Sequence, residues 1–135
     1  MATGSKKILI LALFASAKSF AGPKPDVDLS IMSKTMVYSE VYHMMMSPKD
    51  YEGKIVKIKG TLAVYQDEET GVYYTAVLIA DAAACCQQGL EFEWMGHKYP
   101  KGFPKVGSKI TITGKFTTYE EGGMTYIKLL TDKVD

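Results

Sequence analysis

Two segments with the same order of residue types place the strongest constraint on the fold of this 135-residue chain. Residues 58–65 and 112–119 each carry an isoleucine two positions before a glycine and a tyrosine five positions after it. Apolar and polar residues alternate along the first segment and its flanks, which is typical of a half-buried β-strand. A glycine inside a strand marks a bend or a bulge. A strand that bends can serve both halves of a small barrel, so the repeat favours a closed β-sheet.

Alternation and turn residues together predict five strands. The last two strands form a hairpin, because Gly122 and Gly123 can supply the positive φ angles of a tight turn. Residues 96–107 contain two prolines and are predicted to be an ordered loop instead of a helix. The predicted fold is all-β with one N-terminal helix, a five-stranded OB-like Greek-key barrel in which the first strand pairs with the fourth. The five strands are expected at 53–64, 72–80, 90–94, 109–119 and 124–131.

An amphipathic helix is predicted over residues 34–47, at the start of a domain that spans residues 33–135. Val37, Val41, Met44 and Met45 recur at helical spacing and are expected to share one face. The Ser47-Pro48 pair ends the helix and can begin one further turn.

The N-terminus has the pattern of a secretory signal peptide over residues 1–21. Two lysines precede a short apolar run, and Ser19-Phe20-Ala21 places small residues before a cleavage site. The apolar run is shorter than the roughly 20 residues of a membrane-spanning helix. We therefore expect cleavage after Ala21 and an exported protein, periplasmic, extracellular or associated with the cell envelope, with no stable membrane span. Residues 22–32 contain two prolines and are expected to form a flexible leader.

The charge of the chain disfavours nucleic acid as a partner. The sequence has 16 basic and 15 acidic residues, and every basic residue is a lysine. Removal of Lys6, Lys7 and Lys18 with the signal peptide would leave 13 basic residues and a net charge of −2. Without arginine, the chain has no planar fork that grips phosphates and guanine edges.

Cys85 and Cys86 are the only cysteines and are adjacent. Two neighbouring thiolates can hold a thiophilic metal ion, with His97, Asp81 or Glu91 completing its shell. A structural zinc site is less well matched, because it normally requires four ligands. Two further interpretations stay open. The pair could form a strained, easily reduced disulfide, or the two sulfurs could simply pack at the edge of the barrel.

A second candidate site is aromatic. Six aromatic residues lie on or beside strands where an OB-type barrel presents its ligand face, namely Tyr65, Tyr73, Tyr74, Trp94, Tyr99 and Tyr119. Of these, Tyr73, Trp94 and Tyr99 are expected to bind the ligand, and Asp81 is expected to join them. Glu91 and Glu93 alternate with apolar residues and are expected on a solvated strand face. No catalytic residues are predicted, since a Cys86–His97 nucleophile and base would need a third group to orient it.

Two motifs carry a resemblance to a known family. They are Tyr51-x-Gly53-Lys54 with Val56-x-Ile58-x-Gly60, and Ala80-Asp81-Ala82 followed by Cys85-Cys86-x-x-Gly89-Leu90-Glu91-Phe92. Together they resemble a family of small exported bacterial OB-fold proteins of uncharacterised function, and are more distantly similar to the soluble domain of a permease-associated membrane protein family. The resemblance spans residues 36–132. It implies the fold and no catalytic residues.

The residues and the resemblance lead to one functional expectation and one alternative. The chain is expected to be an exported, non-enzymatic binding module, whose partner is a small molecule, a peptide or a cell-envelope protein. The alternative is a dithiol metal-binding or redox-responsive protein that uses Cys85 and Cys86.

Overall fold

The computed structural model describes residues 24–135 with the exception of residues 82 and 84. The predicted signal peptide, residues 1–21, and the start of the predicted leader lie outside these residues. The described chain is mostly β, with one six-stranded sheet and one α-helix. No helix in this part of the chain is long and apolar enough to cross a membrane.

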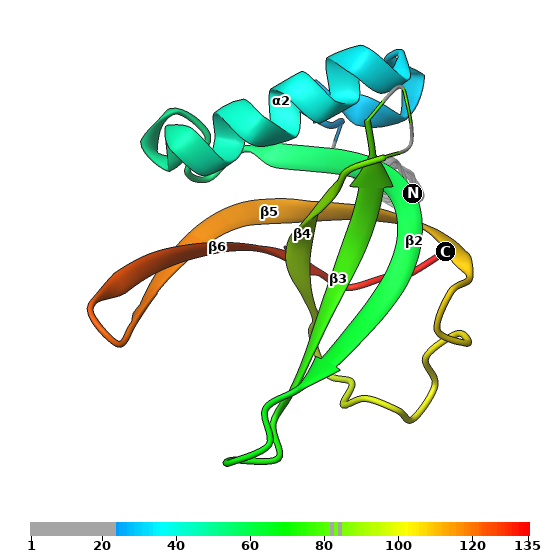
Figure 1. Cartoon of the computed structure of the whole chain (residues 1–135), viewed down its shortest axis with the longest axis vertical. Coiled ribbons are helices and arrows are strands. Elements are labelled where there is room, and N and C mark those ends of the chain that lie inside the picture. Colours follow the sequence, from blue (N-terminus) through cyan, green and yellow to red (C-terminus); the bar gives the residue numbers. More distant parts are fainter. Residues whose placement is uncertain (1–23, 82, 84) are drawn as a thin grey trace, which may run out of the picture.

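All five predicted strands are present, and the sheet closes in a ring. The strand order is β1-β2-β3-β4-β6-β5, and β2 also pairs with β5. Neighbouring strands are antiparallel except for the β1–β2 and β4–β6 pairs, which are parallel. Figure 1 shows α2 lying across one end of this ring. The elements are β1 (Val27–Asp28), α2 (Lys34–Met46), β2 (Ile55–Gln66), β3 (Tyr73–Ala80), β4 (Gln87–Trp94), β5 (Lys109–Glu121) and β6 (Met124–Thr131).

The ring closes because β2 changes its partner near Gly60. Residues before this point pair with β5, residues after it pair with β3, and Thr61 pairs with both. A Cβ atom on Gly60 would lie 2.4 Å from the carbonyl oxygen of Leu78 and 2.7 Å from Cγ1 of Val77. Only glycine permits this close approach of β2 to β3. The predicted pairing of the first strand with the fourth is confirmed.

The second repeat segment, in β5, also changes its pairing partner beside a glycine. β5 changes its partner from β2 to β6 at Lys115, one residue after Gly114. A Cβ on Gly114 would lie 2.7 Å from the carbonyl oxygen of Leu130. Two glycines at equivalent positions therefore permit two equivalent changes of partner.

The helix α2 covers one end of the core. It begins after Ser33, whose hydroxyl accepts a hydrogen bond from the backbone N–H of Met36, and ends at Met46, close to the predicted 34–47. Val41 and Met44 are buried as expected, but Met45 is exposed, so the predicted apolar face is narrower than the spacing implies. The buried apolar side chains of the core are Leu29, Val41, Met44, Tyr51, Val56, Ile58, Leu62, Val77, Ile79, Leu90, Phe92, Ile110, Ile112, Phe116 and Leu129.

Residues 27–31 are not a flexible leader in the structure. Val27 and Asp28 form β1, which pairs with Val56 and Lys57 of β2, and Leu29 is buried in the core. The carboxylate of Asp28 caps the following 3-10 turn by accepting from the backbone N–H of Ser30. The sequence prediction failed here because a two-residue strand is too short to show alternation.

The close approach at Gly60 leads to a stability prediction. We expect Gly60→Val to lower the free energy of unfolding by about 1–3 kcal/mol, because its side chain would overlap the β3 backbone. Lys59→Ala is the matched control, since the neighbouring Lys59 side chain is exposed and its loss should change stability by less than about 0.5 kcal/mol. Urea denaturation measures both. Equal midpoints for Gly60→Val and the wild type would contradict the packing argument.

Candidate functional site

The structure divides the predicted site residues between two ends of the β3–β4 pair. Cys85 and Cys86 precede β4 at one end, whereas Tyr73 begins β3 and Trp94 ends β4 at the other. Each strand has eight residues, so at about 3.3 Å per residue its ends are roughly 23 Å apart. His97 lies with Trp94, far from the cysteines. The prediction that His97 completes a metal shell with Cys85 and Cys86 is therefore wrong. His97 follows the last residue of β4 by three positions, whereas the cysteines precede the first residue of the same strand.

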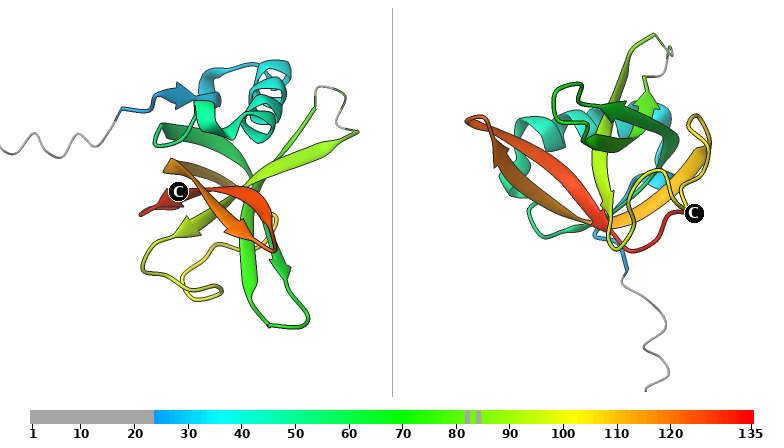
Figure 2. Two further views of the ribbon diagram at one scale, coloured as in Figure 1. Left: turned by 90° about the vertical axis from the view of Figure 1, so that its left-hand side faces the viewer. Right: turned by 90° about the horizontal axis from the view of Figure 1, so that it is seen from below.

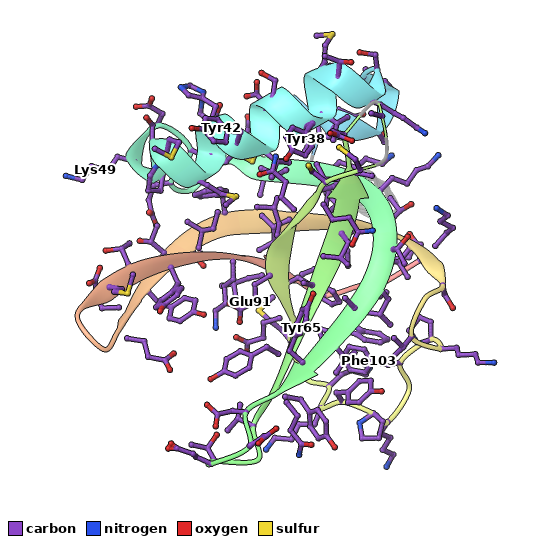
Figure 3. All side chains as sticks on the ribbon, in the orientation of Figure 1. Tyr38, Tyr42, Lys49, Tyr65, Glu91 and Phe103 are labelled. Atoms are coloured by element: carbon purple, nitrogen blue, oxygen red, sulfur yellow. The ribbon has the colours of Figure 1, made fainter. Side chains whose placement is uncertain are left out.

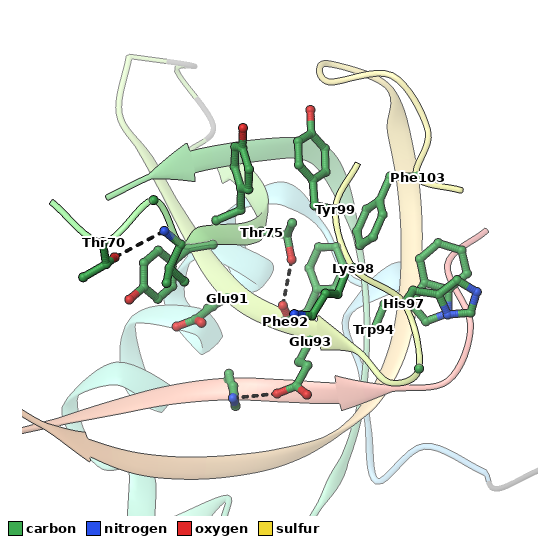
Figure 4. A pocket seen from close by; sticks show the side chains of 16 residues that line it. Thr70, Thr75, Glu91, Phe92, Glu93, Trp94, His97, Lys98, Tyr99 and Phe103 are labelled. Atoms are coloured by element: carbon green, nitrogen blue, oxygen red, sulfur yellow. Dashed lines mark hydrogen bonds and ion pairs between the residues drawn. The ribbon is translucent and has the colours of Figure 1, made fainter. Parts of the chain in front are cut away.

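The first candidate site is a groove of about 780 Å³ at the end of the ring opposite α2, here called the open-end groove. Figure 2 shows that the β2–β3 turn and the loop after β4 lie at this end. Figure 4 shows the lining side chains. They are Thr70, Val72, Tyr73, Tyr74, Thr75, Glu91, Phe92, Glu93, Trp94, His97, Lys98, Tyr99, Phe103 and Lys128, with backbone from Gly71 and Gly96.

Aromatic rings of the open-end groove contact one another in a continuous series. His97 stacks on Trp94 with ring centroids 3.8 Å apart, and Phe103 meets Trp94 edge-on at 5.0 Å. Tyr99 contacts Phe103 at 5.4 Å and Tyr73 at 5.0 Å. The structure thus brings together three of the four predicted ligand-binding residues, Tyr73, Trp94 and Tyr99. Rings held by such contacts offer preformed faces for stacking.

The second candidate site is a groove of about 530 Å³ between the β2–β3 strands and the β5–β6 hairpin, here called the hairpin groove. Figure 3 shows Tyr65 and Glu91 on the same side of the sheet in this region. The groove adjoins the open-end groove, since Tyr74, Thr75 and Glu91 line both. Its lining residues are Tyr65, Asp67, Tyr74, Thr75, Ala76, Leu78, Gly89, Glu91, Tyr119, Glu121 and Tyr126.

Strand register explains why tyrosines converge on the hairpin groove. Tyr65 pairs with Tyr74 across β2 and β3, and Tyr119 pairs with Tyr126 across β5 and β6. The Tyr119 and Tyr126 rings stack with centroids 5.5 Å apart. Side chains alternate between the two faces of a strand, so these residues lie on the face opposite the core. Tyr65 and Tyr119 are the last residues of the two repeat segments, 58–65 and 112–119.

Glu91 sits between the two grooves and is half-buried, which corrects the prediction of a solvated side chain. The hydroxyl of Tyr119 donates a hydrogen bond to its Oε1. Burial raises the pKa of Glu91 above the ordinary value of 4.5, although the Tyr119 hydrogen bond and Lys128 act in the opposite direction. Burial and the Glu91 carboxylate also raise the pKa of Tyr119. Glu93, by contrast, is exposed as predicted, and its Oε1 pairs with Nζ of Lys128 at 2.7 Å.

The third candidate site is the cysteine cluster, formed by Asp81, Cys85 and Cys86. One ligand atom from each residue lies within 4.8 Å of the other two. The Sγ atoms of Cys85 and Cys86 are 3.3 Å apart and are not bonded as a disulfide. The Cys85 thiol donates to Oδ2 of Asp81 at 3.2 Å, and the Cys85 backbone N–H donates to Oδ1 at 3.0 Å. Asp81 therefore lies with the cysteines, as expected for a residue that completes a metal shell, and not with the aromatic residues that it was also expected to join. Glu91, which was considered for the same shell, is not part of the cluster.

Exposure and electrostatics narrow what the cysteine cluster can do. Both cysteines are exposed, so the interpretation that they are packing residues is wrong. Hydrogen bonds to Cys86 and to Asp81 raise the pKa of the Cys85 thiol, which disfavours a reactive thiolate. Tyr38 of α2 lies near the cluster. Burial is the main cause of its raised pKa, and the charges of Cys86, Asp81 and Cys85 raise this pKa further. No Cys86–His97 pair exists.

Several groove residues have no role in the sequence-based prediction, among them Phe103, Tyr126 and Glu121. Phe103 was part of a loop predicted only as ordered, and it contacts both Trp94 and Tyr99. Tyr126 and Glu121 were assigned to a hairpin without a role, and both line the hairpin groove. A signal for Tyr126 was available, because hairpin register through Gly122-Gly123 pairs it with Tyr119.

No family model matches the chain, and no curated protein matches it significantly. The function of the protein is therefore inferred from the geometry of the three sites.

The raised pKa of Glu91 leads to a pH-dependent stability prediction. The folded protein holds the Glu91 proton more tightly than the unfolded chain, so ionisation opposes folding above the raised pKa and has no effect below the ordinary value of 4.5. Glu91→Gln keeps an acceptor for Tyr119 and should therefore be more stable than the wild type at neutral pH. This advantage should disappear as the pH falls to about 4.5.

Urea denaturation across this pH range measures the effect of Glu91→Gln. Glu93→Gln is the control, because it removes an exposed charge that pairs with Lys128 and should not stabilise the protein. An advantage of Glu91→Gln that stays constant down to acidic pH would contradict the burial argument.

Proposed function

We propose that this protein is an exported, non-enzymatic binding module whose ligand occupies the joined open-end and hairpin grooves. The observation that carries the proposal is their continuity, since Tyr74, Thr75 and Glu91 line both. Their volumes of about 780 and 530 Å³ fall within the usual range of ligand sites. Export itself rests on the signal-like residues 1–21 of the sequence.

The strand order supports an OB-like barrel as the finer description of the ring. If β2 to β6 are renumbered as strands 1 to 5, their order around the ring is 1-2-3-5-4, and strand 4 pairs again with strand 1. Strands 3 and 5, which are β4 and β6, are parallel. This is a Greek-key order, and the OB-fold binds its ligands on the face of its middle strands, between the loops after strands one and four. Both grooves include residues from the corresponding β2–β3 turn region or β5–β6 hairpin. The resemblance to small exported OB-fold proteins agrees with this description and stays a prediction.

The groove chemistry favours a small molecule or a peptide over nucleic acid. Aromatic rings can stack on a base, a sugar or an apolar side chain. Binding of a phosphate backbone also requires a basic surface. The hairpin groove is instead lined by Asp67, Glu91 and Glu121, and the chain has no arginine.

The single tryptophan of the chain, Trp94, lines the open-end groove and reports on its occupancy. We expect at least one of three probes, maltotriose, tetra-alanine or spermidine, to change Trp94 fluorescence or the amide NMR signals of groove residues. Single-stranded oligodeoxythymidine should have no effect at physiological salt. Tyr99→Ala should weaken a ligand of the open-end groove about fivefold or more, as truncation of a stacked ring usually does.

Tyr42→Ala is the matched control, because Tyr42 is exposed on α2 at the opposite end of the ring. It should leave binding unchanged. A panel in which no probe perturbs any groove residue would overturn the proposed function.

The cysteine cluster supports a second candidate function, the binding of a thiophilic metal ion. Two thiols and one carboxylate converge within 4.8 Å, and thiolates select soft ions. A metal ion binds the thiolate form of Cys85, so the thiol proton must leave on binding. Because the pKa of this thiol is raised, metal uptake should strengthen as the pH rises. The redox form of this second candidate is a reversible disulfide between the same two cysteines, whose Sγ atoms are 3.3 Å apart.

Cadmium is a suitable probe for the cysteine cluster, because thiolate coordination gives an ultraviolet charge-transfer band. Cys85→Ser and Cys86→Ser should each abolish the band, and the double variant should add little, since the sulfurs share one site. His97→Ala is the control and should bind normally. Loss of the band in His97→Ala, or its persistence in either serine variant, would contradict the cluster as described.

A further inference from the structure

The two grooves differ in charge. In the open-end groove, Glu93 is neutralised by its ion pair with Lys128. The hairpin groove is lined by Asp67, Glu91 and Glu121, and by no lysine or histidine among the described residues. None of these three carboxylates takes part in an ion pair within the described chain. The hairpin groove therefore gathers three acidic groups without a basic side chain in its lining.

The hairpin groove is also electrostatically negative at its tyrosines. The carboxylate of Glu121 is the main cause of the raised pKa of Tyr74, and Asp67 and Glu91 act in the same direction. Burial raises the pKa of Glu91 as well. A positive group in this groove would stabilise the ionised Glu91 and offset the repulsion among the carboxylates.

Four tyrosine rings line the same groove. Tyr119 and Tyr126 stack on each other, and among the described residues this stacking does not involve the rings of Tyr65 and Tyr74. Tyr65, Tyr74, Tyr119 and Tyr126 come from four different strands, β2, β3, β5 and β6. A cation over an aromatic ring is attracted by the negative face of the ring. The Tyr119 ring already makes one such contact, because Nζ of Lys128, which lines the adjoining open-end groove, lies 5.0 Å from its centroid.

The arrangement of the carboxylates fits an extended organic cation better than a metal ion. A metal requires ligand atoms that converge on one point. Among the described residues, only Asp81, Cys85 and Cys86 converge in this way, and none of them lines the hairpin groove. Asp67, Glu91 and Glu121 are instead spread over a groove of about 530 Å³, together with the tyrosine rings.

We infer that the hairpin groove binds a ligand with alkylammonium groups, held by the carboxylates of Asp67, Glu91 and Glu121 and by the tyrosine faces. The inference rests on the binding role proposed above and specifies the class of ligand. Two sources offer this chemistry, a free polyamine and the lysine side chain of a peptide.

Isothermal titration calorimetry of the full chain tests the inference with two probes. Spermidine represents the polyamine, and the blocked amino acid N-acetyl-lysine methylamide represents the peptide. The neutral N-acetyl-norleucine methylamide is the control ligand. We expect at least one ammonium probe to bind at low salt, to weaken as salt screens the charges, and to bind more tightly than the neutral analogue. Binding of the lysine probe indicates a peptide source, and binding of spermidine alone indicates a free polyamine.

Variants locate the binding site. Glu121→Gln should weaken the ammonium probe about fivefold, as expected for loss of one nearby charge at a solvated site. Tyr126→Leu should weaken it as well by removing a ring face. Glu120→Gln is the matched control, because Glu120 is the neighbouring acidic residue, lies outside the groove lining and contacts Thr125. It should change the affinity less than twofold, within about 0.4 kcal/mol.

Two results would overturn the inference. One is the absence of binding by both ammonium probes at millimolar concentration in a folded wild-type protein. The other is an equal loss of affinity in Glu120→Gln and Glu121→Gln, which would indicate attraction to overall charge. If maltotriose or tetra-alanine still perturbs groove residues while both ammonium probes fail, the binding function stands and the cationic ligand class is wrong.

Discussion

Closure of the sheet through β2 is the interaction on which the rest of the structure depends. One strand pairs with β5 in its first half and with β3 in its second, and the change of partner occurs beside Gly60. The carbonyl of Leu78 would lie only 2.4 Å from a Cβ at this position. If residue 60 carried a side chain, β3 could not approach β2 closely enough to pair along its second half. The ring, the enclosed core and the outward face of the ring all follow from this contact.

Closure also determines which polar residues meet. The outward face carries residues of β3, β4, β5 and β6 that are distant in sequence, and the parallel β4–β6 pair places Glu91 beside Lys128. Tyr119 then reaches Glu91 from the β5–β6 hairpin. Because burial raises its pKa, the Glu91 carboxylate is expected to reduce stability at neutral pH, and groups with shifted pKa values are enriched at functional sites. Glu91 therefore connects the fold to the proposed binding role.

The β3–β4 pair separates two kinds of chemistry. Its end near α2 carries the soft sulfurs of Cys85 and Cys86, and its other end carries the aromatic series that includes Trp94. Roughly 23 Å of strand lies between them, so occupancy of one site has no direct contact with the other. The open-end groove and the cysteine cluster can therefore be tested independently of each other.

The sequence by itself determined the local structure, because alternation, capping and glycine turns act between neighbours in the chain. It predicted five strands, a helix close to Lys34–Met46 and the β2–β5 pairing suggested by the repeated glycines. Tertiary structure alone decided that β1 adds a sixth strand, that His97 stacks on Trp94 far from the cysteines, and that Glu91 is half-buried. Each of these outcomes depends on strand register and on which ends of the strands face each other. No pattern within a single segment of sequence contains that information, because pairing between distant strands sets it.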